Sequence, residues 1–365
     1  MTRRARLRRA RLSGRAPVQT RSHASGPPAV PKLILQGGRR RSRAGRLIAI
    51  LAILAAPVAV AAAALLSFGH DEGHGASGPP LAVSSPAVQS APKEPREPAA
   101  PPTSGEPAPA VRLSGVDAFH IHLRKPPRAG LVFDVRTGDV LWRHRPLRVL
   151  PIASLTKIMT ALLTVERSHP NDPVRITKAA LNYSGSGVGL LPRGKRVRLE
   201  TLLNGLLIVS GNDAAIALAV HLAGTERRFV GMMNRRARDW GLECTHFASS
   251  HGLEDGNRSC TRDLAVLTRL AMAEPRIRRI VRRRQVDFRF PIKGHRLYLY
   301  GHNPLIRAGY RGAIGLKTGF TDEAGRCFIG VARRRGRTLA VVLLNDPNPL
   351  KHSAVLLDAG FRRRG

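Results

Sequence analysis

Aromatic residues, cysteines and acidic residues are all scarce in this sequence. Phe, Trp and Tyr make up 4% of the 365 residues, which disfavours a module that binds ligands by aromatic stacking. Three cysteines exclude a disulfide-dense scaffold and a four-cysteine zinc site. Asp and Glu number 24 against 61 Lys and Arg, and the net charge of +37 excludes a calcium cage. The basic excess predicts anionic neighbours of some kind.

The first 110 residues differ in composition from the rest of the chain and divide into three segments. Residues 1–46 hold 14 Lys and Arg, no acidic residue and little apolar periodicity, so we expect a disordered basic tail. Residues 47–68 are 22 uncharged, mostly apolar residues, a length that can cross a bilayer as a helix. Residues 69–110 contain ten prolines among Ala, Ser, Gly and Glu, which predicts an extended spacer.

The apolar run at 47–68 predicts an uncleaved signal anchor rather than a cleaved signal peptide. The apolar region of a signal peptide is usually about 7–15 residues long, and this run is longer. Five arginines lie between residues 39 and 46, immediately before the run. By the positive-inside rule they keep the tail in the cytoplasm and place the globular part outside it. We therefore expect a single-pass protein of the cell membrane, with secretion after signal cleavage as the alternative.

From about residue 111 the sequence alternates apolar runs with turn residues, a pattern typical of a globular domain. Apolar runs separated by a turn predict a hairpin at 131–135 and 140–142. Longer apolar patterns predict helices at 154–167, 199–223 and 261–273. Two further strands and a closing helix are predicted at 327–332, 338–344 and 351–359. Strands at both ends with helices between them predict an α/β or α+β sandwich whose sheet is completed by both termini of the domain.

The predicted helix at 154–167 begins with Ser154 and carries Lys157 one turn later. Residues three apart share one face of a helix, so the amine is within reach of the serine hydroxyl. A serine hydroxyl is a poor nucleophile until a base removes its proton, and a lysine serves as that base when burial or positive charge lowers its pKa. This spacing is typical of a nucleophile and its base.

Two further motifs follow in chain order. Ser-Gly-Asn at 210–212 offers a hydroxyl for proton relay and an amide that can hold a substrate carbonyl group. Lys-Thr-Gly at 317–319 is expected at the end of an edge strand. Its polar side chains suit a carboxylate, and its glycine lets a substrate backbone approach closely.

The three motifs together are far more specific than any one of them. In a chain of this composition, chance predicts about 0.5 Ser-x-x-Lys matches and about 0.04 Lys-Thr-Gly matches. Ser90 and Lys93 form such a chance match in the proline-rich spacer, where no helix can form. All three motifs in this order, each on a suitable element, are expected by chance well below about 1% of the time.

On these motifs the chain resembles the serine-type D-alanyl-D-alanine carboxypeptidases, which are low-molecular-mass penicillin-binding proteins. The resemblance extends over residues 117–361. It includes the segments PIASLTKIMTA from Pro151, LETLLNGLLIVSGNDAA from Leu199 and GLKTGFT from Gly315. It implies a sandwich of the β-lactamase and transpeptidase type, in which a helical subdomain adjoins an antiparallel sheet.

The resemblance implies a role for each motif residue. Ser154 is the acylated nucleophile, Lys157 is its base, and Ser210 moves protons. The backbone N–H groups of Ser154 and Phe320 form an oxyanion hole, and Lys317 and Thr318 bind a terminal carboxylate. The substrate-binding residues implied are Asn212, Lys317, Thr318, Gly319 and Phe320.

The implied substrate is a peptidoglycan stem peptide that ends in D-Ala–D-Ala. The serine attacks the bond between the two D-Ala residues, D-Ala leaves, and water hydrolyses the acyl-enzyme. Penicillins mimic this substrate, so β-lactams are implied as inhibitors. No cofactor and no metal are expected, because no cluster of His, Cys and Asp has metal-ligand spacing.

Other functions remain open on the same residues. An endopeptidase or a transpeptidase would use the same site, and an inactive wall-binding protein would keep every motif residue. A class A β-lactamase adds a Glu-x-x-Leu-Asn loop after the second motif. Glu200 to Asn204 has that pattern but precedes Ser210, so we expect the first turn of a helix there. A nucleic-acid binder is disfavoured, because the basic residues form no known module.

The cysteines lie in the part of the chain that is expected outside the cytoplasm, where disulfides persist. Fifteen residues with two turn signals separate Cys244 from Cys260, so we expect this segment to double back and bring the two sulfur atoms together. Three unpaired thiols are the alternative. Cys327, in a predicted strand, is expected to be buried and free. The arginine-rich run at 276–284 is expected to form a solvated basic face, with contact to a polyanionic wall as the alternative.

Overall fold

The computed structural model describes residues 109–363. The predicted basic tail, the apolar run at 47–68 and nearly all of the spacer lie outside the described residues. Within 109–363, no helix combines the length and the hydropathy that a membrane span needs. The described residues include all but the last two of the residues assigned to the globular domain, 111–365.

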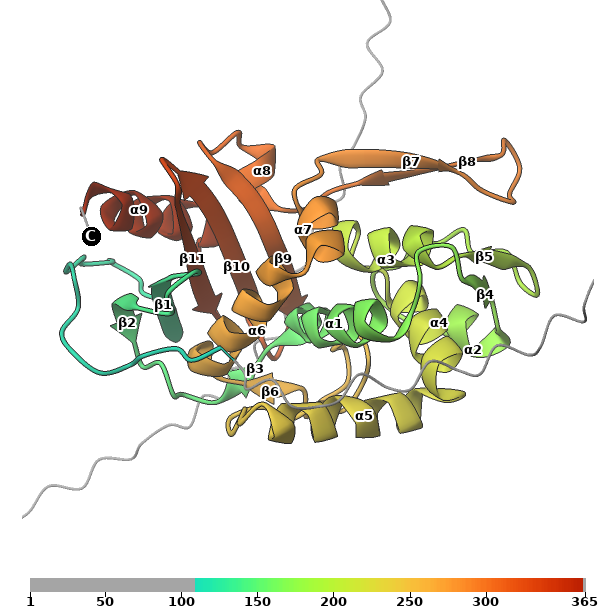
Figure 1. The fold of residues 1–365 in the computed structure, drawn as a ribbon, viewed down its shortest axis with the longest axis horizontal. Helices are drawn as coiled ribbons and strands as arrows, with labels where there is room; N and C mark the ends of the chain where they lie inside the picture. Colours follow the sequence, from blue (N-terminus) through green and yellow to red (C-terminus); the bar gives the residue numbers. More distant parts are fainter. Residues whose placement is uncertain (1–108, 364–365) are drawn as a thin grey trace, which may run out of the picture. The chain divides into compact units, whose positions relative to one another are not determined.

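A five-stranded antiparallel sheet forms one part of the domain (Figure 1). Its strand order is β2-β1-β11-β10-β9, so the first and the last strand in chain order, β1 and β11, are neighbours. The strands are β1 (Ala129–Asp134), β2 (Val140–His144), β9 (Ala313–Thr321), β10 (Gly325–Arg334) and β11 (Arg337–Leu344). The predicted hairpin, the two predicted C-terminal strands and the completion of the sheet by both termini of the domain are confirmed.

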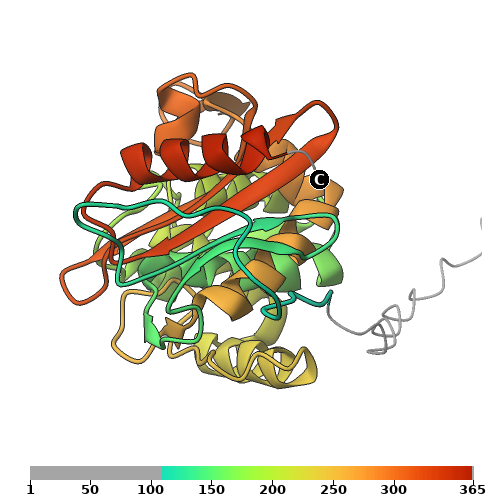
Figure 2. The same ribbon diagram turned by 90° about the vertical axis from the view of Figure 1, so that its left-hand side faces the viewer.

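The sheet is covered on both faces, because successive residues of a strand point to opposite sides. In β1, Leu131 and Phe133 belong to the larger apolar cluster, which includes the central helices. Val132 belongs to the second cluster, together with Val341 of β11 and residues of α9 (Pro349–Arg362). Figure 2 shows α9 lying across one face of the sheet, with the helices of the larger cluster behind it. Burial on both faces explains the nearly continuous apolar sequence of β11.

The rest of the domain is mainly helical and comes from the chain between β2 and β9 (Figure 1). The helices are α1 (Lys157–Arg167), α2 (Lys178–Leu181), α3 (Leu199–Ile208), α4 (Asn212–Ala223), α5 (Glu226–Asp239), α6 (Thr261–Ala273), α7 (Pro275–Val281) and α8 (Pro304–Arg307). Short strands pair as β3 (Leu150–Pro151) with β6 (Arg258–Ser259), β4 (Pro173–Arg175) with β5 (Arg196–Arg198), and β7 (Gln285–Arg289) with β8 (Arg296–Tyr300). The helix predicted at 261–273 is confirmed as α6.

Two predicted helices differ from the structure at the motif serines. The segment 154–167 starts as a 3-10 turn, η1 (Ala153–Thr156), and the α-helix begins only at Lys157. The segment 199–223 is not one helix, because α3 ends at Ile208 and α4 begins at Asn212. Ser210 lies in the break with a φ of +62°, a left-handed conformation that an α-helix excludes.

The arginine-rich run at 276–284 is predicted to form a solvated basic face, and this prediction is wrong for two of its arginines. Arg276 Nη2 lies 3.0 Å from Glu200 Oε2, and both side chains are largely buried. Arg283 Nη1 donates to Asn204 Oδ1 at 2.9 Å. Two arginines of the run therefore hold α7 and the segment after it against α3, while the other arginines of the run are exposed.

Candidate active site

Ser154 and Lys157 meet where the turn η1 passes into helix α1. Lys157 Nζ lies 2.9 Å from Ser154 Oγ, and the lysine side chain is fully buried. The same nitrogen donates to Asn212 Oδ1 and to the His251 carbonyl oxygen, each at 2.7 Å. A neutral amine has two N–H groups, and these two acceptors use both, so its lone pair is left for the serine hydroxyl. The pair has the geometry of a nucleophile and its base.

The pKa of Lys157 lies well below the usual range of lysine. Burial away from water is the largest cause, and the positive charge of Lys317 is the second. The charges of Asp213 and Glu254 act in the opposite direction and are weaker. With its pKa lowered, Lys157 is a neutral amine at pH values where exposed lysines are charged. It can therefore accept the proton of the Ser154 hydroxyl.

The break between α3 and α4 places the second motif against both lysines. Ser210 Oγ accepts a hydrogen bond from Lys317 Nζ at 2.9 Å. Asn212 Nδ2 donates to the Ser184 carbonyl oxygen at 2.6 Å, which leaves the amide oxygen directed to Lys157. The second motif thus links the first motif to the third.

The third motif lies on β9, next to the turn that carries Ser154. Lys317 is 2% exposed, and burial lowers its pKa to about 7. A Cβ on Gly319 would lie 3.1 Å from the Ser154 backbone nitrogen and 3.0 Å from the Ile152 carbonyl oxygen. Only glycine lets β9 approach η1 this closely without displacing backbone atoms.

β9 is an edge strand, so one side of its backbone has no partner strand in the sheet. An extended peptide can pair with such an edge through main-chain hydrogen bonds. Thr318 is partly buried, and Phe320 is 62% exposed on the same stretch of β9. The strand continues to Thr321, so the motif lies within the edge strand rather than at its end.

Two groups that shape the site were not predicted, namely the His251 carbonyl group and the Asp213 side chain. Asp213 is buried, and its two carboxylate oxygens accept hydrogen bonds from the Val188 and Gly189 backbone N–H groups, each at 2.9 Å. The aspartate thereby fixes the loop between α2 and β5. His251 contributes a backbone atom, which no residue type reveals. Asp213 gave no signal either, because the predicted helix at 199–223 ran through it and the start of α4 was not predicted.

The Glu-x-x-Leu-Asn pattern belongs to helix α3. Glu200 lies in the first turn of α3, as predicted, and pairs with Arg276. Asn204 donates to the Glu200 carbonyl oxygen at 2.7 Å and accepts a hydrogen bond from Arg283. These contacts hold helices together, so the pattern does not form the deacylation loop of a class A β-lactamase.

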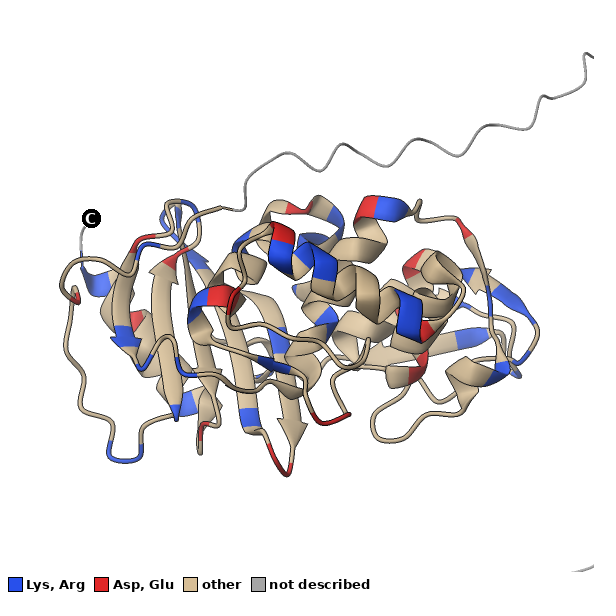
Figure 3. Ribbon diagram, turned by 90° about the horizontal axis from the view of Figure 1, so that it is seen from below, with Lys and Arg blue, Asp and Glu red and all other residues tan. Residues whose placement is uncertain are grey.

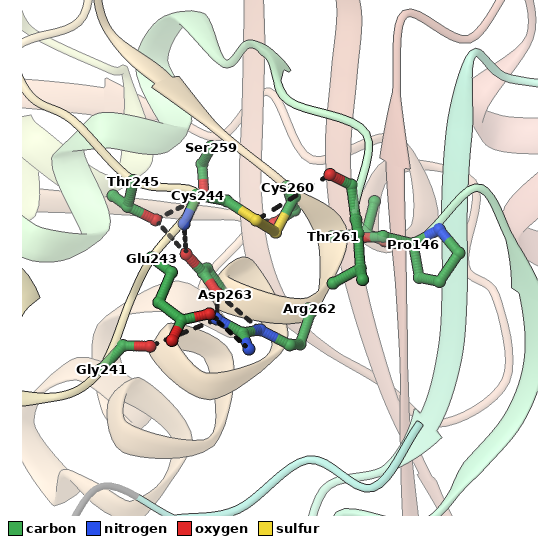
Figure 4. The surroundings of a disulfide bond; sticks show 11 residues. Pro146, Gly241, Glu243, Cys244, Thr245, Ser259, Cys260, Thr261, Arg262 and Asp263 are labelled. Carbon is green, nitrogen blue, oxygen red and sulfur yellow. Dashed lines mark hydrogen bonds and ion pairs between the residues drawn. A yellow bond between two sulfur atoms is a disulfide. The ribbon is translucent and has the colours of Figure 1, made fainter. Parts of the chain in front are cut away.

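Cys244 and Cys260 form the predicted disulfide, with their Cα atoms 5.5 Å apart (Figure 4). Asp263 Oδ2 accepts hydrogen bonds from the Cys244 backbone N–H and from Thr245 Oγ1, each at 2.8 Å. The two sulfur atoms and this carboxylate lie close enough to share a metal ion, but sulfur atoms bonded to each other offer no thiolate. Cys327 is buried and free, and burial raises the pKa of its thiol to about 12.

The sequence is similar to a protein-family model and to curated bacterial proteins. A family model described as D-alanyl-D-alanine carboxypeptidase matches residues 126–348. The D-alanyl-D-alanine carboxypeptidase DacF of Bacillus subtilis is 31% identical over 243 residues, which are 64% of this chain and 62% of that protein. A D-alanyl-D-alanine endopeptidase of Haemophilus influenzae is 31% identical over 229 residues, which are 61% of this chain and 77% of that protein.

A solved structure matches most of the domain. The crystal structure of a Streptomyces DD-transpeptidase superposes with a TM-score of 0.62 at 30% identity. The match covers 67% of this chain and 100% of that one. By contrast, the chain spans less than two thirds of the length of the Bacillus subtilis relative.

Proposed function

This chain belongs to the D-alanyl-D-alanine carboxypeptidase family, and we propose that it is a serine hydrolase of peptidoglycan stem peptides. It removes the terminal D-Ala from peptides that end in D-Ala–D-Ala, through an acyl-enzyme. The observation that carries this proposal is the 2.9 Å contact between Ser154 Oγ and the buried Lys157 Nζ, in which the lysine has a lowered pKa. The pair supplies a nucleophile and a base from the chain's own residues.

Acylation starts when Lys157 Nζ takes the proton of Ser154 Oγ as this oxygen attacks the carbonyl carbon between the two D-Ala residues. The backbone N–H groups of Ser154 and Phe320 stabilise the oxyanion, on two elements that Gly319 allows to approach closely. The C–N bond then breaks, the leaving amine takes a proton relayed by Ser210, and D-Ala departs. Water hydrolyses the remaining ester, with Lys157 again as the base.

Asn212, Lys317 and Thr318 bind the peptide. The pKa of Lys317 is about 7, so an arriving carboxylate favours its charged form and gains an ion pair. Thr318 adds a hydroxyl donor beside it, and the Asn212 amide holds a backbone carbonyl group of the peptide. A peptide without a free C-terminal carboxylate loses the contacts to Lys317 and Thr318, which favours a carboxypeptidase.

A D,D-endopeptidase is the second candidate, because the similar protein of Haemophilus influenzae carries that name. An endopeptidase would use the same serine on a cross-link between two stem peptides. Release of D-Ala from a single stem peptide, compared with cleavage of a cross-linked dimer, separates the two activities.

The proposal includes a location at the cell membrane. Residues 47–68 serve as an uncleaved signal anchor, residues 69–110 as a spacer, and the domain from residue 111 lies outside the cytoplasm, where peptidoglycan is found. The Cys244–Cys260 disulfide supports this side of the membrane, because disulfides persist in oxidising compartments. Secretion after cleavage of the apolar run is the alternative.

Mass spectrometry of the full chain after incubation with penicillin tests the proposed activity. We expect one penicillin per chain on the peptide that contains Ser154, and D-Ala release from a D-Ala–D-Ala peptide. Ser154→Ala should show neither. Ser90→Ala is the matched control, since Ser90 has the same spacing to a lysine but lies in the spacer, and it should behave as wild type. Normal D-Ala release by Ser154→Ala would refute the proposal.

A further inference from the structure

The edge of the sheet at the β10–β11 turn carries a hollow that is lined mainly by arginines. It has a volume of about 520 Å³ and lies between the ends of β10 and β11 and the C-terminal end of α9. We call it the arginine hollow, and its lining residues are Arg311, Arg334, Arg335, Arg337, Asp358, Phe361, Arg362 and Arg363. Six of these eight residues are arginines and one is acidic, so the hollow is strongly positive.

Most of this positive charge has no acidic partner. Asp358 Oδ1 lies 2.8 Å from Arg334 Nη1, and Asp134 Oδ2 lies 3.9 Å from Arg337 Nε. The other four arginines of the hollow are exposed and form no ion pair within residues 109–363. Basic residues also occur on both parts of the domain in the view from below (Figure 3), so charge alone marks no site. A second hollow, at β5 and the β7–β8 hairpin, is also basic, but it is lined by four arginines. The arginine hollow has six and lies at the edge of the sheet.

Arg334 is held in a fixed position in the wall of the hollow. Its guanidinium group lies over the rings of Tyr310 and Phe361, 4.7 Å from each ring centroid. Its Nε donates to the Arg311 carbonyl oxygen at 3.0 Å. Since Arg334 is already paired with Asp358, it forms a rigid wall of the hollow rather than a free phosphate ligand. The four exposed arginines around it keep their guanidinium groups free, and these groups suit the oxygens of several phosphate groups.

The described chain starts at the same edge of the sheet. The Val135 backbone N–H donates to the Thr338 carbonyl oxygen at 2.9 Å, so the β1–β2 turn lies beside the first residues of β11. The Arg112 backbone N–H donates to the Gly138 carbonyl oxygen of that turn at 3.0 Å. The sequence upstream of this point includes the apolar run at 47–68.

We infer that the arginine hollow binds the phosphate groups of anionic phospholipids and docks the domain on the membrane that carries the anchor. This inference rests on the proposed membrane topology, because the anchor and its spacer keep the domain close to the outer face of this bilayer. The positive charge of the hollow also favours this docking, since each basic residue near an anionic membrane surface strengthens binding up to about fivefold.

Docking at this edge directs the active site away from the bilayer. Cys327 of β10 pairs with Gly319 of β9, and its sulfur lies 3.7 Å from the Pro151 carbonyl oxygen, close to Ser154 in the chain. Arg334 follows Cys327 by seven positions along β10. At about 3.3 Å per residue, the two ends of this strand are roughly 23 Å apart. The nucleophile therefore stands roughly 20 Å from the lipid surface, on the side of the wall.

Flotation with lipid vesicles tests the inference on the fragment 109–365. This fragment contains both apolar clusters and matches the whole of a solved DD-transpeptidase chain, so it is a folding unit. We expect it to bind vesicles of phosphatidylcholine with about 30% phosphatidylglycerol, and not vesicles of phosphatidylcholine alone. Binding should weaken as the salt concentration rises.

The variant R311Q/R335Q/R362Q/R363Q should bind the anionic vesicles at least about 100-fold more weakly. The matched control is R227Q/R228Q/R235Q/R238Q, which removes four exposed arginines from α5 and should bind as wild type. Both variants should form the penicillin adduct on Ser154, which keeps docking separate from the proposed catalysis. Equal weakening in the two variants, or no binding to anionic vesicles, would overturn the inference. Binding to soluble polyphosphate without binding to vesicles would also overturn it and indicate a soluble phosphate polymer.

Discussion

Two buried lysines share the active site, and the charge of one lowers the pKa of the other. Burial is the main cause of the lowered pKa for both, and the charge of Lys317 is the second cause for Lys157. In the proposed mechanism Lys157 has to be neutral to accept the proton of Ser154, whereas Lys317 binds a carboxylate in its charged form. The lysine that is proposed to bind substrate therefore also lowers the pKa of the proposed base.

Replacing Lys317 by Met should move the acidic limb of the pH profile for penicillin acylation to higher pH. The substitution removes a positive charge that lowers the pKa of Lys157, so the base stays protonated up to a higher pH. The measurement is the second-order rate constant for acylation of Ser154 between about pH 5 and pH 10. An acidic limb that stays in place, whatever the absolute rate, would contradict this coupling.

The same substitution has a defined effect on stability. The pKa of Lys317 is about 7 in the folded domain, below its ordinary 10.5, so the unfolded chain binds more protons between these two values. The free energy of unfolding of the wild type therefore increases as pH rises from about 7 toward 10.5. It decreases again as pH falls through the same window, because the unfolded chain then gains a proton that the buried Lys317 does not take up. Lys317→Met removes that contribution. Its stability relative to wild type, measured by urea unfolding, should be highest at and below about pH 7 and decrease toward pH 10.

Glu226 fixes the loop whose carbonyl oxygen binds Lys157. Its Oε1 accepts hydrogen bonds from the Ser250 backbone N–H at 3.0 Å and from Ser250 Oγ at 2.6 Å, and His251 follows directly. Glu226→Ala should slow acylation on the order of 10–100-fold with little change in KM for a D-Ala–D-Ala peptide, because the base is displaced. Glu226→Gln keeps an acceptor oxygen and is the matched control, with a rate close to wild type. An unchanged rate in the Ala variant would show that the loop holds itself in place.

Among the elements, the break between α3 and α4 is the feature that the sequence did not reveal. Residues 199–223 are apolar almost throughout, so the pattern continues across the break. Serine and glycine are only mildly unfavourable within a helix, and they give a weak signal. The break is stabilised instead by tertiary hydrogen bonds, from Lys317 to Ser210 and from Lys157 to Asn212. The motif residues were predictable, but the backbone that presents them was not.

Glycine and alanine at position 210 should separate the backbone role of Ser210 from the role of its hydroxyl. Ser210→Gly and Ser210→Ala both remove Oγ and should both lose most of the acylation rate. The φ of +62° disfavours alanine by about 1 kcal/mol, so the glycine variant should melt roughly 2–4 °C higher. Ser168, with a φ of −151°, is the control position, where glycine should give no such advantage. An alanine variant as stable as the glycine variant at position 210 would argue against the left-handed backbone.

The Cys244–Cys260 disulfide joins the segment after α5 to the start of α6. A cross-link around a loop of about 15 residues contributes about 3 kcal/mol in the chain-entropy model. The double variant Cys244→Ser with Cys260→Ser should lose about that much free energy of unfolding and keep the penicillin adduct, because neither segment carries a motif residue. The unfolded, unreduced wild type should show one reactive thiol, that of Cys327. Three reactive thiols in that experiment would contradict the pairing.

Over the whole domain, the sequence predicts the sheet better than the helical part. The strands β1, β10 and β11 correspond to continuous apolar runs bounded by turns, a short-range signal. Helix α5 was not predicted, because it buries only Phe229, Met233 and Ala237 among many charged residues. Such a narrow stripe is difficult to distinguish from a solvated segment. Arg276 was placed in solvent because its partner, Glu200, lies far away in the sequence, and pairing over that distance leaves no local pattern.

Protease added to intact cells should test the topology of the whole molecule. We expect the domain from residue 111 to be removed and a small tail, residues 1–46 with the anchor, to remain in the membrane fraction. The positive-inside rule gives this orientation, and a cytoplasmic protein that stays intact serves as the control. A mature chain that begins near residue 65 and is free of the membrane would show that the apolar run is cleaved.

The central strand of the sheet, β11, is the last strand to be synthesised. β11 is the final strand in chain order, yet it lies between β1 and β10, so the β9–β10 hairpin joins the N-terminal strands only through β11. Phe133 pairs with Ala340, which is synthesised about 200 residues later. Contacts between residues so far apart in the sequence slow folding, because a long loop has to close before they form. Ser154 packs beside β9 and β10, so the nascent chain has no complete active site until synthesis is nearly finished. On the proposed topology, a chain that is exported before it folds is therefore inactive during biosynthesis and becomes active only outside the cytoplasm.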